Sequence, residues 1–148
     1  MKKYIGVKLV EARPMTRGEY NIFRGWTIPE NEDPSDKGYK TVTPDGLIQW
    51  QPKQQFKETH RPTDGMTFGM AIEAVKKGFK IARIGWNGKG VFLLHVSNPD
   101  YGIINEIGLN IPAANILPWI GIKTADNKFV PWLPSQADML ADDWQIVE

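Results

Sequence analysis

The most regular alternation of apolar and polar residues in the chain begins at Thr67. The apolar residues that follow recur with the spacing of one helix face: Phe68, Ala71, Ile72 and Val75. Thr67 is a good N-cap and Gly78 a good stop signal, so the pattern predicts a helix between them. Two apolar runs, residues 79–84 and 91–96, then predict two strands. The second run, VFLLHV, is apolar on both faces and indicates a strand in the middle of a sheet or in an interface.

The remaining C-terminal residues carry weaker patterns. Residues 97–115 have no clean period and indicate a long loop, with or without an extra strand. Residues 119–124 and 128–132 enclose a turn and predict a hairpin. Pro131 lies in its second arm, which therefore ends there or runs along a sheet edge.

Two short elements are predicted to close the chain. Ser135 is the N-cap of a short helix, with Asp138 as its partner in a capping box, and residues 144–147 form a last strand. The order of helix, two strands, hairpin, short helix and strand predicts an α+β fold with a small, mostly antiparallel sheet.

The first part of the chain reads as a separate small α+β unit. Residues 4–12 predict a strand that Pro14 ends. A helix follows over residues 17–24, with Thr16 as N-cap and Gly25 as stop signal.

A hairpin and a boundary complete this unit. The hairpin spans residues 39–50 and turns at Pro44-Asp45-Gly46, and Pro52 then opens a short helix. Residues 61–65 (RPTDG) have the polarity, proline and glycine of a linker. We therefore predict two domains, residues 1–62 and 63–148.

Composition narrows the class of protein. The chain has 148 residues, 41% of them hydrophobic, and a formal net charge of +1. It lacks the clustered basic excess of a nucleic-acid surface, so no DNA or RNA partner is expected. With no cysteine and only His60 and His95, thiol chemistry is excluded and no metal site is expected. The sequence shows neither a signal peptide nor a membrane span, which predicts a soluble, cytosolic protein without a membrane partner.

The first candidate site is the stretch GWNGKG, residues 85–90, between two predicted strands. Its glycines open backbone N–H groups to close approach, and Trp86, Asn87 and Lys89 add a ring, an amide and a cation. Such a turn is able to stack a flat ring and to hydrogen-bond a polar edge or a phosphate. Asn-Gly is also a common turn pair, so the residues alone favour an ordinary hairpin turn.

The second candidate site is PWLPSQADMLADDW, residues 131–144. Trp132 and Trp144 are typical core anchors. Ser135, Gln136 and Asp138 lie at a predicted helix start, where N–H groups and side chains suit an anion or a ribose. Capping alone explains Ser135 and Asp138 and is the default interpretation.

Groups that transfer protons are scarce. Asp138 and Asp142 lie four residues apart and share a helix face if the helix lasts that long, but a solvated acidic surface is favoured over a catalytic or metal-binding pair. His95 lies on an apolar strand face, where a hydrogen-bonded core residue is favoured over a catalytic one. The residues alone indicate binding rather than catalysis.

Two segments together, MTFGMAIEAVKKGFKIARIGWNGKGVFLLHV and IKTADNKFVPWLPSQADMLADDWQIVE, resemble the phage Thoeris anti-defence proteins of the second type. The resemblance covers about residues 66–148 and is weakest in the middle loop. It implies a sponge without enzymatic activity or cofactor, acting in the host bacterial cytoplasm, that sequesters the cyclised ADP-ribose signal of a TIR-domain enzyme. Some members also hold cyclic dinucleotides such as cyclic GMP–AMP. The family assembles as homotetramers, dimers of dimers with pockets at subunit interfaces.

Carried onto this chain, the resemblance places ligand contacts in both motifs. The residues are Arg83, Trp86, Asn87, Gly88, Trp132, Ser135, Gln136 and Asp138. Trp86 is expected to stack on an adenine, and Asn87, Ser135 and Asp138 to take ribose hydroxyls or base edges. Arg83 and nearby N–H groups are expected to meet the phosphates.

Two alternatives stay open. A phage structural or interaction module would use GWNGKG only as a turn and would bind no small ligand. A hydrolase of the signal nucleotide would use Asp138, Asp142 or His95. The resemblance implies no activity for residues 1–62, which we interpret as an accessory unit.

Overall fold

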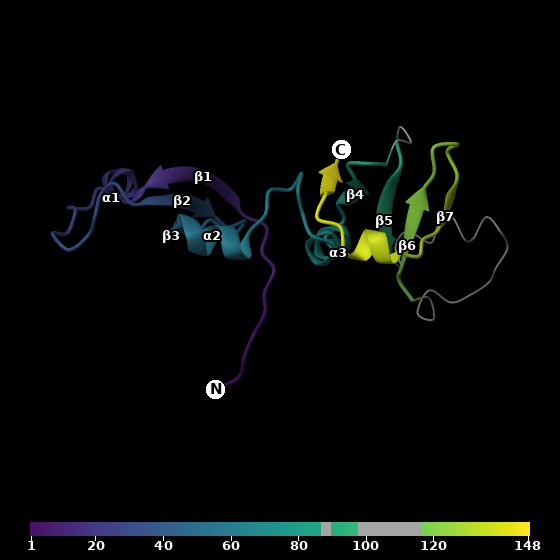
Figure 1. Cartoon of the computed structure of the whole chain (residues 1–148), viewed down its shortest axis with the longest axis horizontal. Helices are drawn as coiled ribbons and strands as arrows, with labels where there is room; N and C mark the ends of the chain where they lie inside the picture. The colour runs from purple at the N-terminus through teal and green to yellow at the C-terminus, as the bar shows by residue number, and fades with distance from the viewer. Residues whose placement is uncertain (87–89, 98–116) are drawn as a thin grey trace. The chain divides into compact units, whose positions relative to one another are not determined.

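The computed structural model describes residues 1–86, 90–97 and 117–148. The chain forms two compact units, Met1–Arg61 and Pro62–Glu148, each with its own antiparallel sheet (Figure 1). This confirms the predicted α+β class. In the described residues, no helix combines the length and the apolar character needed to cross a membrane.

The first unit is a three-stranded sheet with two helices. Its elements in chain order are β1 (Glu11–Thr16), α1 (Arg17–Arg24), β2 (Lys37–Val42), β3 (Ile48–Pro52) and α2 (Lys53–Thr59). The strands pair in the order β1-β2-β3. The helix predicted after Thr16 is confirmed: the Thr16 hydroxyl accepts from the Glu19 N–H, and Gly25 ends the helix with a φ of 70°.

The strand predicted at residues 4–12 is wrong. Residues 1–10 form neither helix nor strand, and β1 starts at Glu11 and runs through Pro14, which lies opposite Tyr39. Proline is tolerated there because β1 is an edge strand, where a missing N–H on the outer side breaks no ladder bond. The apolar residues Tyr4 and Ile5 are 90% and 100% exposed, because the unit offers them no partner strand.

An ion pair ties α1 to the loop that follows it. The Arg17 guanidinium donates to both carboxylate oxygens of Glu32, and the buried Asn21 amide donates to one of them at 3.0 Å. These bonds lower the pKa of Glu32 to about 2. The polar loop is thereby fastened to the helix without an apolar core of its own.

The second unit is a five-stranded sheet covered by one main helix. Its elements in chain order are α3 (Phe68–Lys76), β4 (Lys80–Arg83), β5 (Phe92–Val96), β6 (Trp119–Lys123), β7 (Phe129–Pro131), α5 (Gln136–Met139) and β8 (Trp144–Val147). The strand order is β7-β6-β5-β4-β8, and every pair is antiparallel. The central place predicted for VFLLHV and the edge place predicted for Pro131 are both confirmed. The predictions for residues 98–115 fall outside the described residues.

The core of the second unit lies between α3 and the sheet. Ile81 of β4 pairs with Leu93 of β5 and with Ile146 of β8, and α3 packs across these three strands. Ile81, Leu93, Val75 and Trp144 have no exposed surface. Trp144 is both the first residue of β8 and a member of this core, and Trp86 and Trp132 of the two candidate motifs pack against the core.

Two glycines of this unit give a matched test of packing. A Cβ on Gly121 would collide with the Phe129 ring on the neighbouring strand, whereas a Cβ on Gly69 of α3 meets nothing within 4 Å. Gly121→Ala should therefore destabilise the unit by about 1–3 kcal/mol. Gly69→Ala should stabilise it by about 0.5–1 kcal/mol, because alanine favours the helix. Urea unfolding followed by tryptophan fluorescence measures both, and equal effects of the two substitutions would contradict the packing described here.

Candidate functional site

Three tryptophans from the two motifs form one aromatic cluster. The ring centroid of Trp86 lies 6.2 Å from that of Trp132 and 5.4 Å from that of Trp144, and Trp132 lies 5.9 Å from Trp144. All three pairs meet edge to face, the geometry that aromatic quadrupoles favour. Trp144 is fully buried, whereas Trp86 and Trp132 are half-buried.

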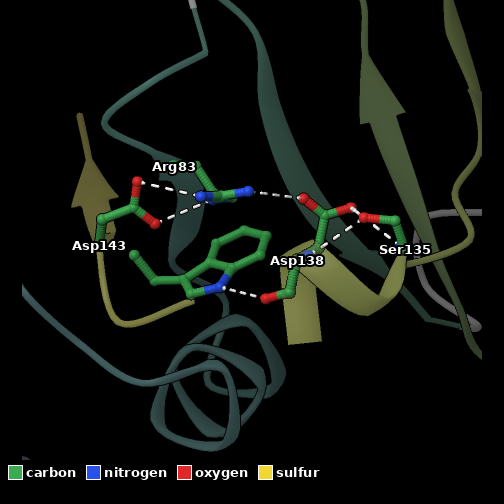
Figure 2. Close-up of polar contacts among 5 residues, drawn as sticks. Arg83, Ser135, Asp138 and Asp143 are labelled. Atoms are coloured by element: carbon green, nitrogen blue, oxygen red, sulfur yellow. Dashed lines mark hydrogen bonds and ion pairs between the residues drawn. The ribbon is translucent and has the colours of Figure 1, made fainter. Parts of the chain in front are cut away.

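A polar network joins the same two motifs beside this cluster. Arg83, the last residue of β4, donates from Nε to Asp143 at 2.9 Å and from Nη2 to the other oxygen of that carboxylate at 3.3 Å. Its Nη1 donates to Asp138 of α5 at 3.1 Å. Figure 2 shows the guanidinium lying between the two carboxylates. One arginine therefore binds the chain just before β8 and the short helix α5 at once.

Asp138 connects the network to the start of α5 and to the cluster. Its second carboxylate oxygen accepts from the Ser135 N–H at 2.9 Å and from the Ser135 hydroxyl at 2.7 Å (Figure 2). The Asp138 N–H donates back to Ser135 Oγ at 3.1 Å, which confirms the predicted capping box. The Asp138 carbonyl accepts from Trp144 Nε1 at 3.0 Å.

Hydrogen bonds within the network favour the ionised forms of Asp138, Asp143 and Arg83. The largest influence on the pKa of Asp138 is burial, which raises it, but hydrogen bonds from Ser135 and Arg83 outweigh that effect and the pKa is lowered. The pKa of Asp143 is lowered mainly by its hydrogen bonds from Arg83. The pKa of Arg83 is raised by the same bonds, first from Asp143 and then from Asp138. The three side chains therefore carry a formal charge of −1 at neutral pH.

The structure brings together most of the predicted site residues. Arg83, Trp86, Trp132, Ser135 and Asp138 belong to the cluster or its network, and Gln136 is exposed at the first position of α5. Asn87 and Gly88 fall outside the described residues. The phosphate contact predicted for Arg83 has competitors in the structure, namely the two carboxylates that already accept from its guanidinium.

One pairing considered from the sequence is wrong, and one residue was missed. The helix α5 ends at Met139, so Asp138 and Asp142 do not share a helix face. Asp143, one residue further on, is the second partner of Arg83 instead. A contact between residues 60 positions apart leaves no local pattern, and only the antiparallel pairing of β4 with β8 brings the two together.

His95 and metal binding complete the inventory. His95 is half-buried on β5, opposite Ile120 of β6. Among the described residues, no three His, Cys, Asp or Glu side chains are grouped so as to hold a metal ion. The described groups offer ring surfaces, ionised carboxylates, hydroxyls and N–H donors.

The second unit is thus a small antiparallel α+β domain whose two tryptophan-containing motifs meet in one place. The model of the Tad2-like family, the Thoeris anti-defence 2-like domain, matches residues 66–147, and the chain belongs to this family. A relative named Thoeris anti-defense 2, from Bacillus phage SP01, is 45% identical over an alignment of 86 residues that covers 55% of this chain and 94% of the relative. The family match begins at Met66, so the first unit lies outside it.

The lowered pKa values of Asp138 and Asp143 predict how the second unit responds to acid. A carboxylate with a lowered folded-state pKa stabilises the fold above its unfolded pKa of about 3.9, and this contribution is lost as pH falls towards the folded value. Asp143→Asn should lower stability at pH 7 and should flatten its decline below about pH 4. Urea unfolding between neutral and acid pH, followed by tryptophan fluorescence, measures the difference. Parallel stability curves for the two proteins would contradict the role given to this ion pair.

Proposed function

We propose that the second unit binds the cyclic ADP-ribose signal of a TIR-domain enzyme, with glycocyclic ADP-ribose as its ligand, and holds it without degrading it. The downstream Thoeris effector then stays inactive. The carrying observation is that both motifs of the family domain converge on one cluster, joined by the Trp86–Trp132 ring contact and the Arg83–Asp138 ion pair. Cyclic dinucleotides such as cyclic GMP–AMP are a second ligand class in this proposal, which would extend the action to CBASS immunity.

The cluster supplies the contacts that a nucleotide needs. Trp86 is half-buried, and Trp144 and Trp132 pack against its ring and fix its orientation, so in this proposal stacking on an adenine requires little reordering. Base–aromatic stacking is worth roughly 1–3 kcal/mol per base. In this proposal Asn87, Ser135 and Gln136 provide hydrogen bonds to ribose hydroxyls or base edges, and the glycine N–H groups of residues 85–90 meet phosphate.

Binding without turnover agrees with the protonation of the network. A general acid must carry a proton at the working pH. Asp138 and Asp143 have lowered pKa values because Arg83 and other donors stabilise their ionised forms, so both are poor proton donors at neutral pH. At neutral pH these carboxylates therefore serve as fixed hydrogen-bond acceptors and not as general acids.

Assembly is part of the same proposal. We place the protein in the host bacterial cytoplasm as a homotetramer, a dimer of dimers, with ligand sites at its interfaces. The second unit exposes large apolar side chains, which would suit subunit contacts: Phe129, Val130, Leu133 and Leu140.

The direct test follows the ligand. Purified protein is incubated with glycocyclic ADP-ribose and filtered, the retained protein is heated, and both fractions are chromatographed. Intact ligand released only by heat supports sequestration. A degraded product in excess of protein would favour a hydrolase. Free passage of this ligand and of cyclic GMP–AMP through the filter would overturn the proposal in favour of an interaction module.

Trp86 gives the sharpest variant. Trp86→Leu keeps apolar contact with the cluster but removes the stacking surface, so affinity for glycocyclic ADP-ribose should fall by roughly 5- to 150-fold, the equivalent of 1–3 kcal/mol. Trp119→Leu is the matched control, because Trp119 is also half-buried in this unit but packs on Phe129. Calorimetric titration measures both, and equal losses of affinity in the two variants would count against stacking on Trp86.

A further inference from the structure

Arg83 bonds the end of β4 both to the short helix α5 and to the residue just before β8. We infer that Arg83 and Asp143 are positioning residues of the ligand site, and that Arg83 holds the start of α5 in place rather than binding the ligand phosphates. The inference rests on the proposed function. It assigns a role to Asp143, which the sequence motifs did not single out, and a different role to Arg83.

The first step is the geometry of the guanidinium. Nε and Nη2 donate in parallel to the two oxygens of Asp143, and Nη1 donates to Asp138. A planar fork that makes two parallel bonds has its orientation fixed as well as its distance. The third bond therefore leaves in a defined direction, and Asp138 must lie there to accept it.

The second step is that the sheet already holds one partner of Arg83, Asp143, in place. Arg83 pairs with Trp144 in the β4–β8 ladder, and the Ile84 N–H donates to the Asp143 carbonyl at 3.1 Å. The backbone thus fixes Arg83 and Asp143 to each other. The helix α5 is only four residues long, too short to be stable by itself, so it depends on contacts with the rest of the unit.

The third step is what Asp138 carries with it. The same carboxylate that accepts from Arg83 also accepts from the Ser135 N–H and hydroxyl. Arg83 therefore fixes the position of Ser135 through the Asp138 carboxylate. The exposed Gln136 is the next residue in the chain and is positioned with it. These are the residues of α5 to which ligand hydrogen bonds are assigned.

The fourth step is charge. A phosphate that approached Arg83 would compete with two carboxylates within 3.3 Å of its nitrogens, and the group as a whole is anionic. Displacing either carboxylate would leave a part-buried negative charge without its partner, which is costly. Positioning is compatible with the network as it stands, whereas a phosphate contact requires breaking it.

The two roles predict opposite effects of Asp143→Asn. If Arg83 positions α5, loss of the bidentate partner loosens Asp138 and Ser135, and affinity for glycocyclic ADP-ribose should fall by roughly two- to thirtyfold. If Arg83 binds phosphate, the same change frees the guanidinium, and affinity should stay the same or rise. Arg83→Lys also distinguishes the two roles, because lysine keeps the positive charge but cannot make the two parallel hydrogen bonds of the guanidinium.

Controls separate positioning from simple loss of stability. Asp143→Glu keeps the carboxylate and should restore part of the affinity. Asp126→Asn removes an exposed carboxylate paired with Lys128 in the β6–β7 turn and should leave affinity unchanged. Ile81→Val weakens the core without touching the network, and should lower the melting temperature but not the affinity at 25 °C.

Calorimetric titration at two salt concentrations decides the matter. Weaker binding by Asp143→Asn and Arg83→Lys, with the salt dependence of the natural protein retained, supports positioning. Unchanged or tighter binding by Asp143→Asn, or a smaller salt dependence in Arg83→Gln, overturns it. If the natural protein binds neither glycocyclic ADP-ribose nor cyclic GMP–AMP, the proposed function fails and takes the inference with it. Binding by the natural protein with an unaffected Asp143→Asn variant overturns the inference alone.

Discussion

The burial of Trp144 is the constraint on which the second unit depends. This ring has no exposed surface, and its Nε1–H finds the one partner it needs in the Asp138 carbonyl, 3.0 Å away. An indole N–H left unpaired in the core would be costly, so the bond fixes where α5 lies relative to β8. The ring also meets Phe68, Trp86 and Trp132. Core packing and site geometry are therefore set by the same side chain.

Local signals predicted where the elements of this unit begin and end, because caps and strand ends are decided by neighbouring residues. Thr67 caps α3 and Ser135 caps α5 with their own side chains, and Pro131 marks an edge because it lacks an N–H. The N-terminal strand failed for the complementary reason. Residues 4–10 alternate suitably, but a strand also needs a partner, and alternation says nothing about whether one is present.

The site shows the same division between local and distant determinants. The sequence singled out Arg83, Trp86, Trp132, Ser135 and Asp138, and the structure places them together. The Ser135–Asp138 capping box was predictable, because both residues lie in one short segment. The ion pairs of Arg83 were not, because the pairing of β4 with β8 is what brings Arg83 to Asp138 and Asp143. Residues chosen as ligand contacts by chemistry are thus also one another's partners, and local spacing does not distinguish the two roles.

This mutual pairing has a consequence for binding. Side chains that are already hydrogen-bonded and packed lose little freedom when a ligand arrives, so more of the interaction energy appears as affinity. Ser135 and Asp138 are held by a capping box and by Arg83, and Trp86 is held edge-on by two other rings. The proposed function requires tight binding that leaves the bonds of the ligand intact, and a preorganised network of ionised acceptors is compatible with both requirements.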